Sequence, residues 1–226
     1  MIVTPNRLAA AAGLCATAAG TLFIGIQIGH PHLDATSVQT TEVVVRDGLK
    51  VLMAVLALVG ISGMYLSQVR RNGVLGLVGY LILAAGYLLM MSTTLIATVV
   101  LPEVAATDPG YVDGVLDVTT GRTGTADIGA MVAVNQVQGI AYLAGGLLFG
   151  IALFRARVLA RLAAALLAVS GVVTLVLSLM PDAFYRLLAF PNGIAMIGLG
   201  LSLWLGQRRT TAAEAEAAPA TVAAGR

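Results

Sequence analysis

Three carboxylates are the candidates for acid chemistry in this chain. Glu103, Asp47 and Asp182 each lie close to the end of an apolar stretch, in or beside a connecting segment. Partial burial would raise the pKa of such a carboxyl group and keep a proton available near neutral pH. The proton could be transferred to an epoxide or an alkene, with aromatic and Met side chains around the resulting cation. We therefore expect one of the three acids to act as the proton donor of an enzyme for a lipophilic substrate.

Polar and aromatic residues at helical spacing are candidates for binding that substrate. Asn135, Gln138 and Tyr142 share one face of a helix expected over 131–154, because residues three or four apart lie on the same side of a helix. Carboxamides on a membrane helix face protein or water, so they either form interhelical hydrogen bonds that set the packing or line a ligand cavity. The candidate binding residues are His30, Met53, Asn135, Gln138, Tyr142, Phe149, Tyr185 and Asn192.

A second stripe of charged residues continues into Met and small side chains. It consists of Glu42, Arg46, Lys50, Met53, Ala57, Gly60 and Met64. One interpretation is an ion pair between Glu42 and Arg46, one helical turn apart, at the wet end of a helix. The other is the wall of a cleft, with adaptable Met at its floor and Asp47 at its rim.

The two histidines of the chain, His30 and His32, alternate with other residues up to Asp34. Two His and one Asp could ligate zinc, but such a site needs a further ligand and supporting hydrogen bonds. Proton transfer and an ordinary interfacial cap are the other interpretations. Asp113 and Asp117 form either paired carboxylates on a short helix or a solvated pair. We expect no metal and no cofactor.

The elements that position these residues are six apolar stretches without charged residues. The charge-free stretches are 8–29, 51–67, 74–100, 131–154, 162–180 and 187–206. The expected spans are about 8–29, 48–67, 74–100, 131–154, 160–180 and 187–206, each close to the roughly 20 residues that cross a bilayer as a helix. With 58% hydrophobic and 11% charged residues, the composition is typical of a membrane protein. The sequence thus predicts an all-α, polytopic membrane protein, with a six-transmembrane-helix bundle over 1–207 and a disordered cytoplasmic tail over 208–226.

Charge segregation predicts the orientation of the bundle. One set of connections and ends carries Arg7, Arg70, Arg71, Arg155, Arg157, Arg161, Arg208, Arg209 and Arg226, opposed only by Glu214 and Glu216. Because connections rich in Arg stay cytoplasmic, both termini should be cytoplasmic in the plasma (inner) membrane, and any site should lie on the outer side. We expect membrane lipids and a lipophilic small molecule as partners and no nucleic acid. The oligomeric state stays open.

The start of the last span contains a proline at an unusual place. Pro191 inside a helix would remove a backbone hydrogen bond and clash with a preceding carbonyl group. We therefore expect a break there and a short final span that begins near Asn192. Broken helices at membrane depth are found where they are buried in protein or line a cavity.

Two segments of the chain carry a resemblance to known proteins. Arg7-Leu8-Ala9 and the segment from Phe149 to Arg161 resemble uncharacterised multispan membrane proteins common in high-GC actinobacteria, a family that supplies no catalytic residue. In size, all-helical multispan build and acids near a membrane pocket, the chain is also similar to small integral-membrane terpene cyclases. That resemblance implies proton-initiated cyclisation of an isoprenoid-like substrate. The alternative is a non-catalytic module that binds a lipid or a partner protein. A transporter is less expected, because a coupled transporter normally needs ionisable residues near the midplane of the membrane and the spans have none there.

Overall fold

The computed structural model describes residues 4–122, 124, 126–178 and 189–223, and within these ranges it contains helices and no strand. The elements are α1 (Pro5–Gly25), the short 3-10 helix η1 (Ser37–Gln39), α2 (Thr41–Leu66), α3 (Val69–Val99), α4 (Leu101–Ala105), α5 (Pro109–Thr119), α6 (Met131–Ala156), α7 (Arg161–Ser178) and α8 (Ala189–Ala223). The all-α prediction is confirmed.

Five of the described helices are long and apolar enough to cross a membrane. They are α1, α2, α3, α6 and the part of α8 from Ala189 to Ala213. The predicted membrane class of the chain therefore agrees with the structure. The remaining predicted span, 160–180, corresponds to α7, an apolar helix of 18 residues. At 1.5 Å per residue, α7 is about 27 Å long, close to the thickness of the hydrocarbon core.

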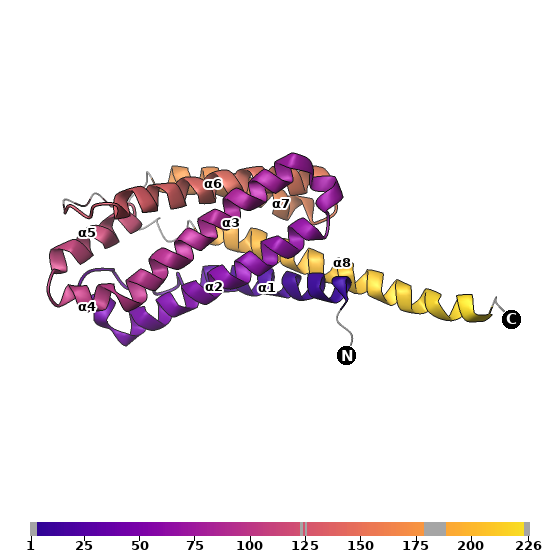
Figure 1. Cartoon of the computed structure of the whole chain (residues 1–226), viewed down its shortest axis with the longest axis horizontal. Coiled ribbons are helices and arrows are strands. Elements are labelled where there is room, and N and C mark those ends of the chain that lie inside the picture. The colour runs from indigo at the N-terminus through magenta and orange to yellow at the C-terminus, as the bar shows by residue number, and fades with distance from the viewer. Residues whose placement is uncertain (1–3, 123, 125, 179–188, 224–226) are drawn as a thin grey trace.

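The long helices run along one axis and form an elongated bundle (Figure 1). Helix α1 packs between α2 and α8, whereas α3 packs on α6 and α6 on α7. The short helices α4 and α5 lie together at one end of the bundle. The start of α1, the turn between α2 and α3 and the C-terminal half of α8 lie at or beyond the opposite end (Figure 1).

Close helix packing depends on glycine at particular contacts. A Cβ atom added to Gly145 on α6 would overlap the backbone of Leu83 on α3. One added to Gly86 on α3 would lie 2.8 Å from the backbone nitrogen of Tyr142 on α6. Small residues let the two backbones approach, which is how helices associate where lipid offers no hydrophobic driving force. These contacts fix the register of α3 against α6.

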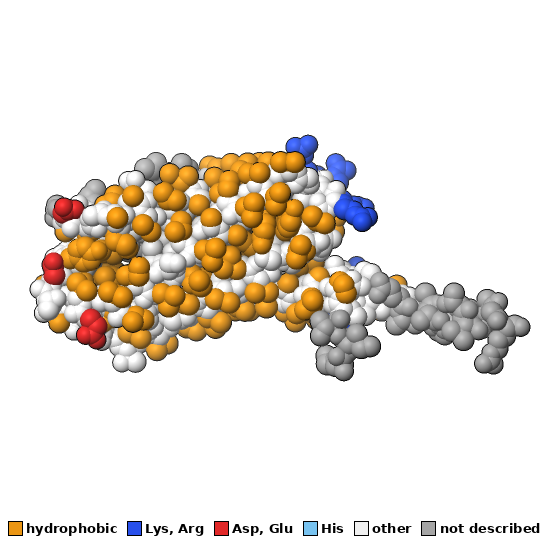
Figure 2. All heavy atoms as spheres, in the orientation of Figure 1, with side chains coloured by type: hydrophobic (Ala, Val, Ile, Leu, Met, Phe, Trp, Pro, Cys, Tyr) orange, Lys and Arg blue, Asp and Glu red, His pale blue; other side chains and the backbone are white. Residues whose placement is uncertain are grey.

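Charge divides the molecule into two ends with an apolar belt between them (Figure 2). We call the end with α4, α5 and the loops around them the acidic end. The basic end is defined by Arg70, Arg71, Arg155, Arg157 and Arg161. The predicted ion pair between Glu42 and Arg46 is present at the acidic end, with 3.0 Å between Arg46 Nη2 and Glu42 Oε1.

A small second core covers the acidic end of the bundle. Val38 of η1, Leu101 of α4 and Val112 of α5 are buried together with neighbouring apolar residues. The backbone N–H of Ala35 donates a 2.7 Å hydrogen bond to Asp113 Oδ1, which ties the loop after α1 to α5. This cap is folded structure, where the sequence predicted a connection between the spans 74–100 and 131–154 with at most a short helix around Asp113 and Asp117.

Two features of α8 bear on the predictions for the C-terminal part. The described part of α8 starts at Ala189 and is helical on both sides of Pro191, so the described residues show no break at this proline. The backbone is helical as far as Ala223, whereas the sequence predicted disorder after 207. The high helix propensity of the many Ala residues in this segment accounts for the difference.

Candidate functional site

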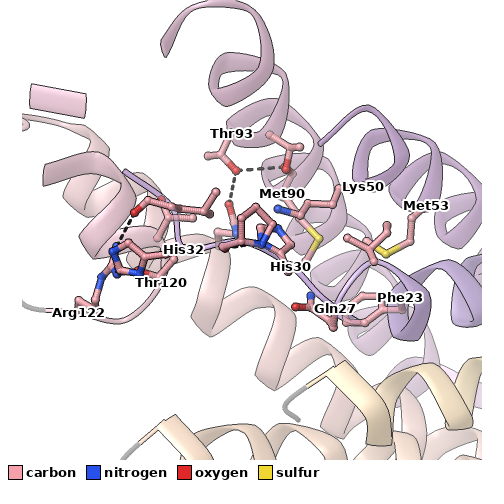
Figure 3. A pocket seen from close by; sticks show the side chains of 16 residues that line it. Phe23, Gln27, His30, His32, Lys50, Met53, Met90, Thr93, Thr120 and Arg122 are labelled. Carbon is pink, nitrogen blue, oxygen red and sulfur yellow. Dashed lines mark hydrogen bonds between the residues drawn. The ribbon is translucent and has the colours of Figure 1, made fainter. Parts of the chain in front are cut away.

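A cavity of about 290 Å³ lies at the acidic end, between the bundle and its cap. It is lined by Phe23, Ile26, Gln27, His30, Pro31, His32, Leu33, Lys50, Met53, Met90, Thr93, Thr94, Thr119, Thr120, Arg122 and Gln138. Its volume is near the lower limit of small-molecule sites, roughly 300 Å³. In Figure 3, Arg122, His32 and Thr120 gather on one side of it, and Phe23, Gln27 and Met53 on the other.

Apolar side chains from three helices form one part of the cavity wall. Phe23 comes from α1, Met53 from α2 and Met90 from α3. Met side chains are flexible and polarisable, so they adapt to ligands of different shape. This part of the cavity suits a hydrocarbon group.

The first polar anchor of the cavity is the ion pair between Lys50 and Asp47. Lys50 Nζ lies 2.7 Å from Asp47 Oδ1, and the Asp47 side chain is only 5% exposed. The carboxylate therefore holds the ammonium group in place. An ammonium group has three N–H donors, so Lys50 keeps donors for a ligand in the cavity that it lines.

The second anchor joins α3 to α6. Thr93 Oγ1 donates a 2.8 Å hydrogen bond to Gln138 Oε1, so one predicted role of Gln138, an interhelical hydrogen bond, is confirmed. Gln138 also lines the cavity, so the hydrogen bond does not exclude its alternative role at a ligand cavity, which stays a prediction. With its oxygen engaged by Thr93, the carboxamide has its two N–H donors left for a bound molecule.

Arg122 fixes the loop that closes the cavity. Its Nη2 donates a 2.9 Å hydrogen bond to the carbonyl oxygen of Leu33, and its Nε lies 2.8 Å from Asp117 Oδ1. Its Nη1 lies 3.1 Å from the ring nitrogens of His32. Asp117 thus forms an ion pair rather than a carboxylate pair with Asp113, which binds Ala35.

Asp34 organises the turn after the two histidines. Its Oδ1 accepts hydrogen bonds from the backbone N–H groups of Ser37 (2.7 Å) and Thr36 (2.9 Å). These hydrogen bonds, that of Ser37 first, lower the pKa of the Asp34 carboxyl group below its usual value. Of the interpretations given for the segment from His30 to Asp34, the interfacial cap is the one that fits Asp34. In the described parts of the chain, no three His, Cys, Asp or Glu side chains are grouped closely enough to hold a metal ion.

The structure describes two of the three candidate acids, and neither of them lines the cavity. Glu103 is exposed on α4 and does not line the cavity. Asp47 lies behind Lys50 as its ion-pair partner. Asp182 lies outside the described residues, as does the candidate binding residue Tyr185.

The other candidate binding residues fall into two groups. His30, Met53 and Gln138 line the cavity. The cavity is not lined by the other four, which are Tyr142, Phe149, Asn192 and Asn135. Tyr142 stacks on the cavity residue Phe23 with 6.4 Å between ring centroids, while Phe149 is fully buried in the core.

Hydrogen bonds hold the two asparagines of that second group. Asn192 Nδ2 lies 3.4 Å from Tyr87 Oη in the interior of the bundle. Asn135 Nδ2 donates to the carbonyl oxygen of Met131, and its Oδ1 lies 3.4 Å from Thr119 Oγ1, which belongs to the cavity wall. Both residues therefore support the structure around the cavity rather than line it.

Sequence reasoning left Lys50, Thr93 and Arg122 out of the candidate binding residues. Lys50, the only lysine of the chain, was nevertheless part of the stripe that one interpretation made the wall of a cleft. The positions of Thr93 and Arg122 in the fold are set by tertiary contacts, with α6 and with the loop at 33 respectively. No local sequence pattern indicates such contacts.

The fold and the cavity define the chain as a helical membrane protein with a ligand-sized site at its acidic end. Comparisons with protein-family models, curated proteins and solved structures find no match to it.

Proposed function

We propose that the chain is a six-span protein of the plasma membrane, with its basic end and both termini in the cytoplasm. The start of α1 and the C-terminal half of α8 lie towards the same end of the bundle, which requires an even number of crossings (Figure 1). Helix α7 supplies the sixth crossing. The arginines of the basic end support the orientation, because Arg-rich connections are retained on the cytoplasmic side. The cavity then opens towards the outer half of the membrane.

The function proposed for this cavity is the binding of a lipophilic molecule with an oxygen-bearing polar group. The observation that carries the proposal is the convergence of two N–H donors, Lys50 and Gln138, beside the apolar wall formed by Phe23, Met53 and Met90. Oxygen atoms of a hydroxyl, carboxylate or phosphate group would accept from these donors, and the hydrocarbon would contact the apolar wall. Isoprenoid alcohols and fatty acids have this chemistry.

Acid-initiated cyclisation of an isoprenoid-like substrate stays a prediction with less support than binding. Such a reaction needs a protonated carboxyl group that faces the substrate. Glu103 is exposed away from the cavity, and Asp47 is engaged as a carboxylate by Lys50. A membrane assay with polyprenyl and epoxyprenyl substrates, in which Glu103, Asp47 and Asp182 are replaced singly by the matching amide, tests it. Loss of product in one variant would favour the enzyme.

Binding is tested with the full chain in nanodiscs and with farnesol and oleic acid as probes. We expect Gln138→Leu to weaken binding of the better probe by about tenfold, because one hydrogen bond of about 1.4 kcal/mol is lost. The matched control is Val137→Leu, one residue away on the exposed face of α6. Equal affinity of both variants and wild type, or no binding of either probe, would contradict the proposal.

A further inference from the structure

A second cavity, of about 260 Å³, lies at the basic end where the α2–α3 turn meets the C-terminal part of α6. It is lined by Arg71, Asn72, Gly73 and Val74 of α3, and by Arg155 of α6 on its other side. It is separate from the site at the acidic end and takes no part in the function proposed above.

Asn72 is the central polar group of this second cavity. Its side chain is buried, with the residue 5% exposed, and neither its Oδ1 nor its Nδ2 atom has a hydrogen-bond partner. A buried polar group without a partner costs about 1–3 kcal/mol, so its retention is explained where a ligand satisfies it. The backbone of Asn72 is held in place by its N–H bond to the carbonyl oxygen of Gln68, at 3.1 Å.

Two guanidinium groups flank this carboxamide. Arg71 and Arg155 are exposed, and neither forms an ion pair with a carboxylate in the described part of the chain. The acidic residues that precede α6 all lie in α4, in α5, in the first two turns of α2 or in the loops of the opposite end. A planar guanidinium binds a phosphate group through two parallel N–H bonds, so two of them create a strong preference for that anion.

The backbone adds donors at the same place. Gly73 adopts φ 58° and ψ −163°, which interrupts α3, and the helix restarts after it. The left-handed φ favours glycine. The first backbone N–H groups of a restarted helix point towards its N-terminal end, where they and the helix dipole favour an anion. Gly73 and Val74, which line the cavity, form that end.

We infer that this second cavity binds a phosphate group, held by Arg71, Arg155 and the Asn72 carboxamide at the restarted helix. The group could belong to an anionic membrane lipid or to free phosphate. The adjacent surface of α3 is apolar and open, with Val74 78%, Leu77 40% and Val78 41% exposed. A lipid seated by its phosphate would lay its acyl chains along this surface.

The test measures binding of dioleoylphosphatidylglycerol to the full chain in detergent by native mass spectrometry. Dioleoylglycerol, which lacks the phosphate, and inorganic phosphate as a competitor are the other probes. We expect Arg71→Gln and Arg155→Gln each to weaken phosphatidylglycerol binding by about tenfold. Arg70→Gln is the matched control, because Arg70 is exposed next to Arg71 but does not line the cavity.

Competition distinguishes the two sources of phosphate. Displacement of the lipid by inorganic phosphate, with the same dependence on both arginines, assigns the site to free phosphate, and lack of displacement assigns it to a lipid headgroup. Asn72→Ala should also weaken binding, yet it should not lower the melting temperature of the lipid-free protein, because an unsatisfied polar group is removed. Equal binding of dioleoylglycerol, or equal effects of Arg70→Gln and Arg71→Gln, would overturn the inference.

Discussion

Lys50 and Asp47 lie one helical turn apart on α2, and their side chains meet at 2.7 Å at the edge of the cavity. The Asp47 carboxylate is almost fully buried, so removal of Lys50 would leave a buried charge without its ion-pair partner. In the proposed function this pair holds the sole lysine of the chain as a donor for the ligand, and Asp47, a candidate catalyst in the sequence, would position that lysine.

Loss of the lysine should therefore affect stability as well as binding. We expect Lys50→Met to lower the free energy of unfolding by about 1–3 kcal/mol, because Asp47 is left buried without its partner. The double variant Asp47→Leu/Lys50→Met should recover most of that stability but none of the probe binding. Thermal unfolding in detergent measures the first effect. Wild-type stability of Lys50→Met would contradict this account of the pair.

The contact between α3 and α6 should be sensitive to a single methyl group. Gly145→Ala places a Cβ atom against the backbone of Leu83, which cannot yield as a flexible side chain would. We expect a loss of stability of about 1–3 kcal/mol. Gly139→Ala is the control on the same helix, because a Cβ atom there meets nothing within 4 Å. Similar melting temperatures for the two variants would show that the helices are not in contact at Gly145.

The pH dependence of the cap should depend on Asp34. Hydrogen bonds from Ser37 and Thr36 lower its pKa in the folded state, so its contribution is complete above the unfolded pKa of about 3.9 and is lost as pH falls through the lower, folded value. Asp34→Asn cannot titrate, so the stability advantage of wild type over this variant should shrink on acidification from pH 7 to about pH 3. Melting temperatures at the two pH values measure this. An advantage that stays constant would refute it.

Much of the fold was predictable, because an apolar stretch of about 20 residues without charges is by itself enough to predict a membrane helix. The predicted span 131–154 differs from α6 by two residues at its end, and the predicted span 160–180 contains all of α7. Helix α4 was not predicted, and α5 was predicted only as a possible short helix around Asp113 and Asp117. Its start was visible in the sequence, because Asp108 followed by Pro109 is a typical helix start, and Asp108 does cap α5 by accepting from the N–H of Tyr111.

The site was predictable only in part. Helix phase identified Met53 and Gln138 correctly as inward-facing residues, since each belongs to one helix whose polar face is visible in the sequence. It could not show that Thr93 of α3 would meet Gln138 of α6, because a periodic pattern does not specify which helices become neighbours. Helix phase also predicted Phe149 as a binding residue, but Phe149, which shares that face, lies in the core.

The proposed orientation predicts the location of the C-terminal end. A reporter fused after Gln207 should behave as cytoplasmic, because α8 carries Arg208 and Arg209 at its exit from the apolar segment. The control is the same reporter inserted after Gly121, in the loop that follows α5 at the acidic end. A periplasmic signal after Gln207 would reverse the orientation of the whole bundle.

The central claim is that a lipophilic molecule occupies the cavity beside Lys50, and a protection measurement tests it most directly. Because Lys50 is the only lysine, an amine-reactive reagent modifies one side chain, and peptide mapping separates it from the N-terminal amine. We expect farnesol or oleic acid to slow modification of Lys50 in wild type and in the Val137→Leu control, but much less in Gln138→Leu. An unchanged rate of Lys50 modification at saturating concentrations of both probes would contradict the account.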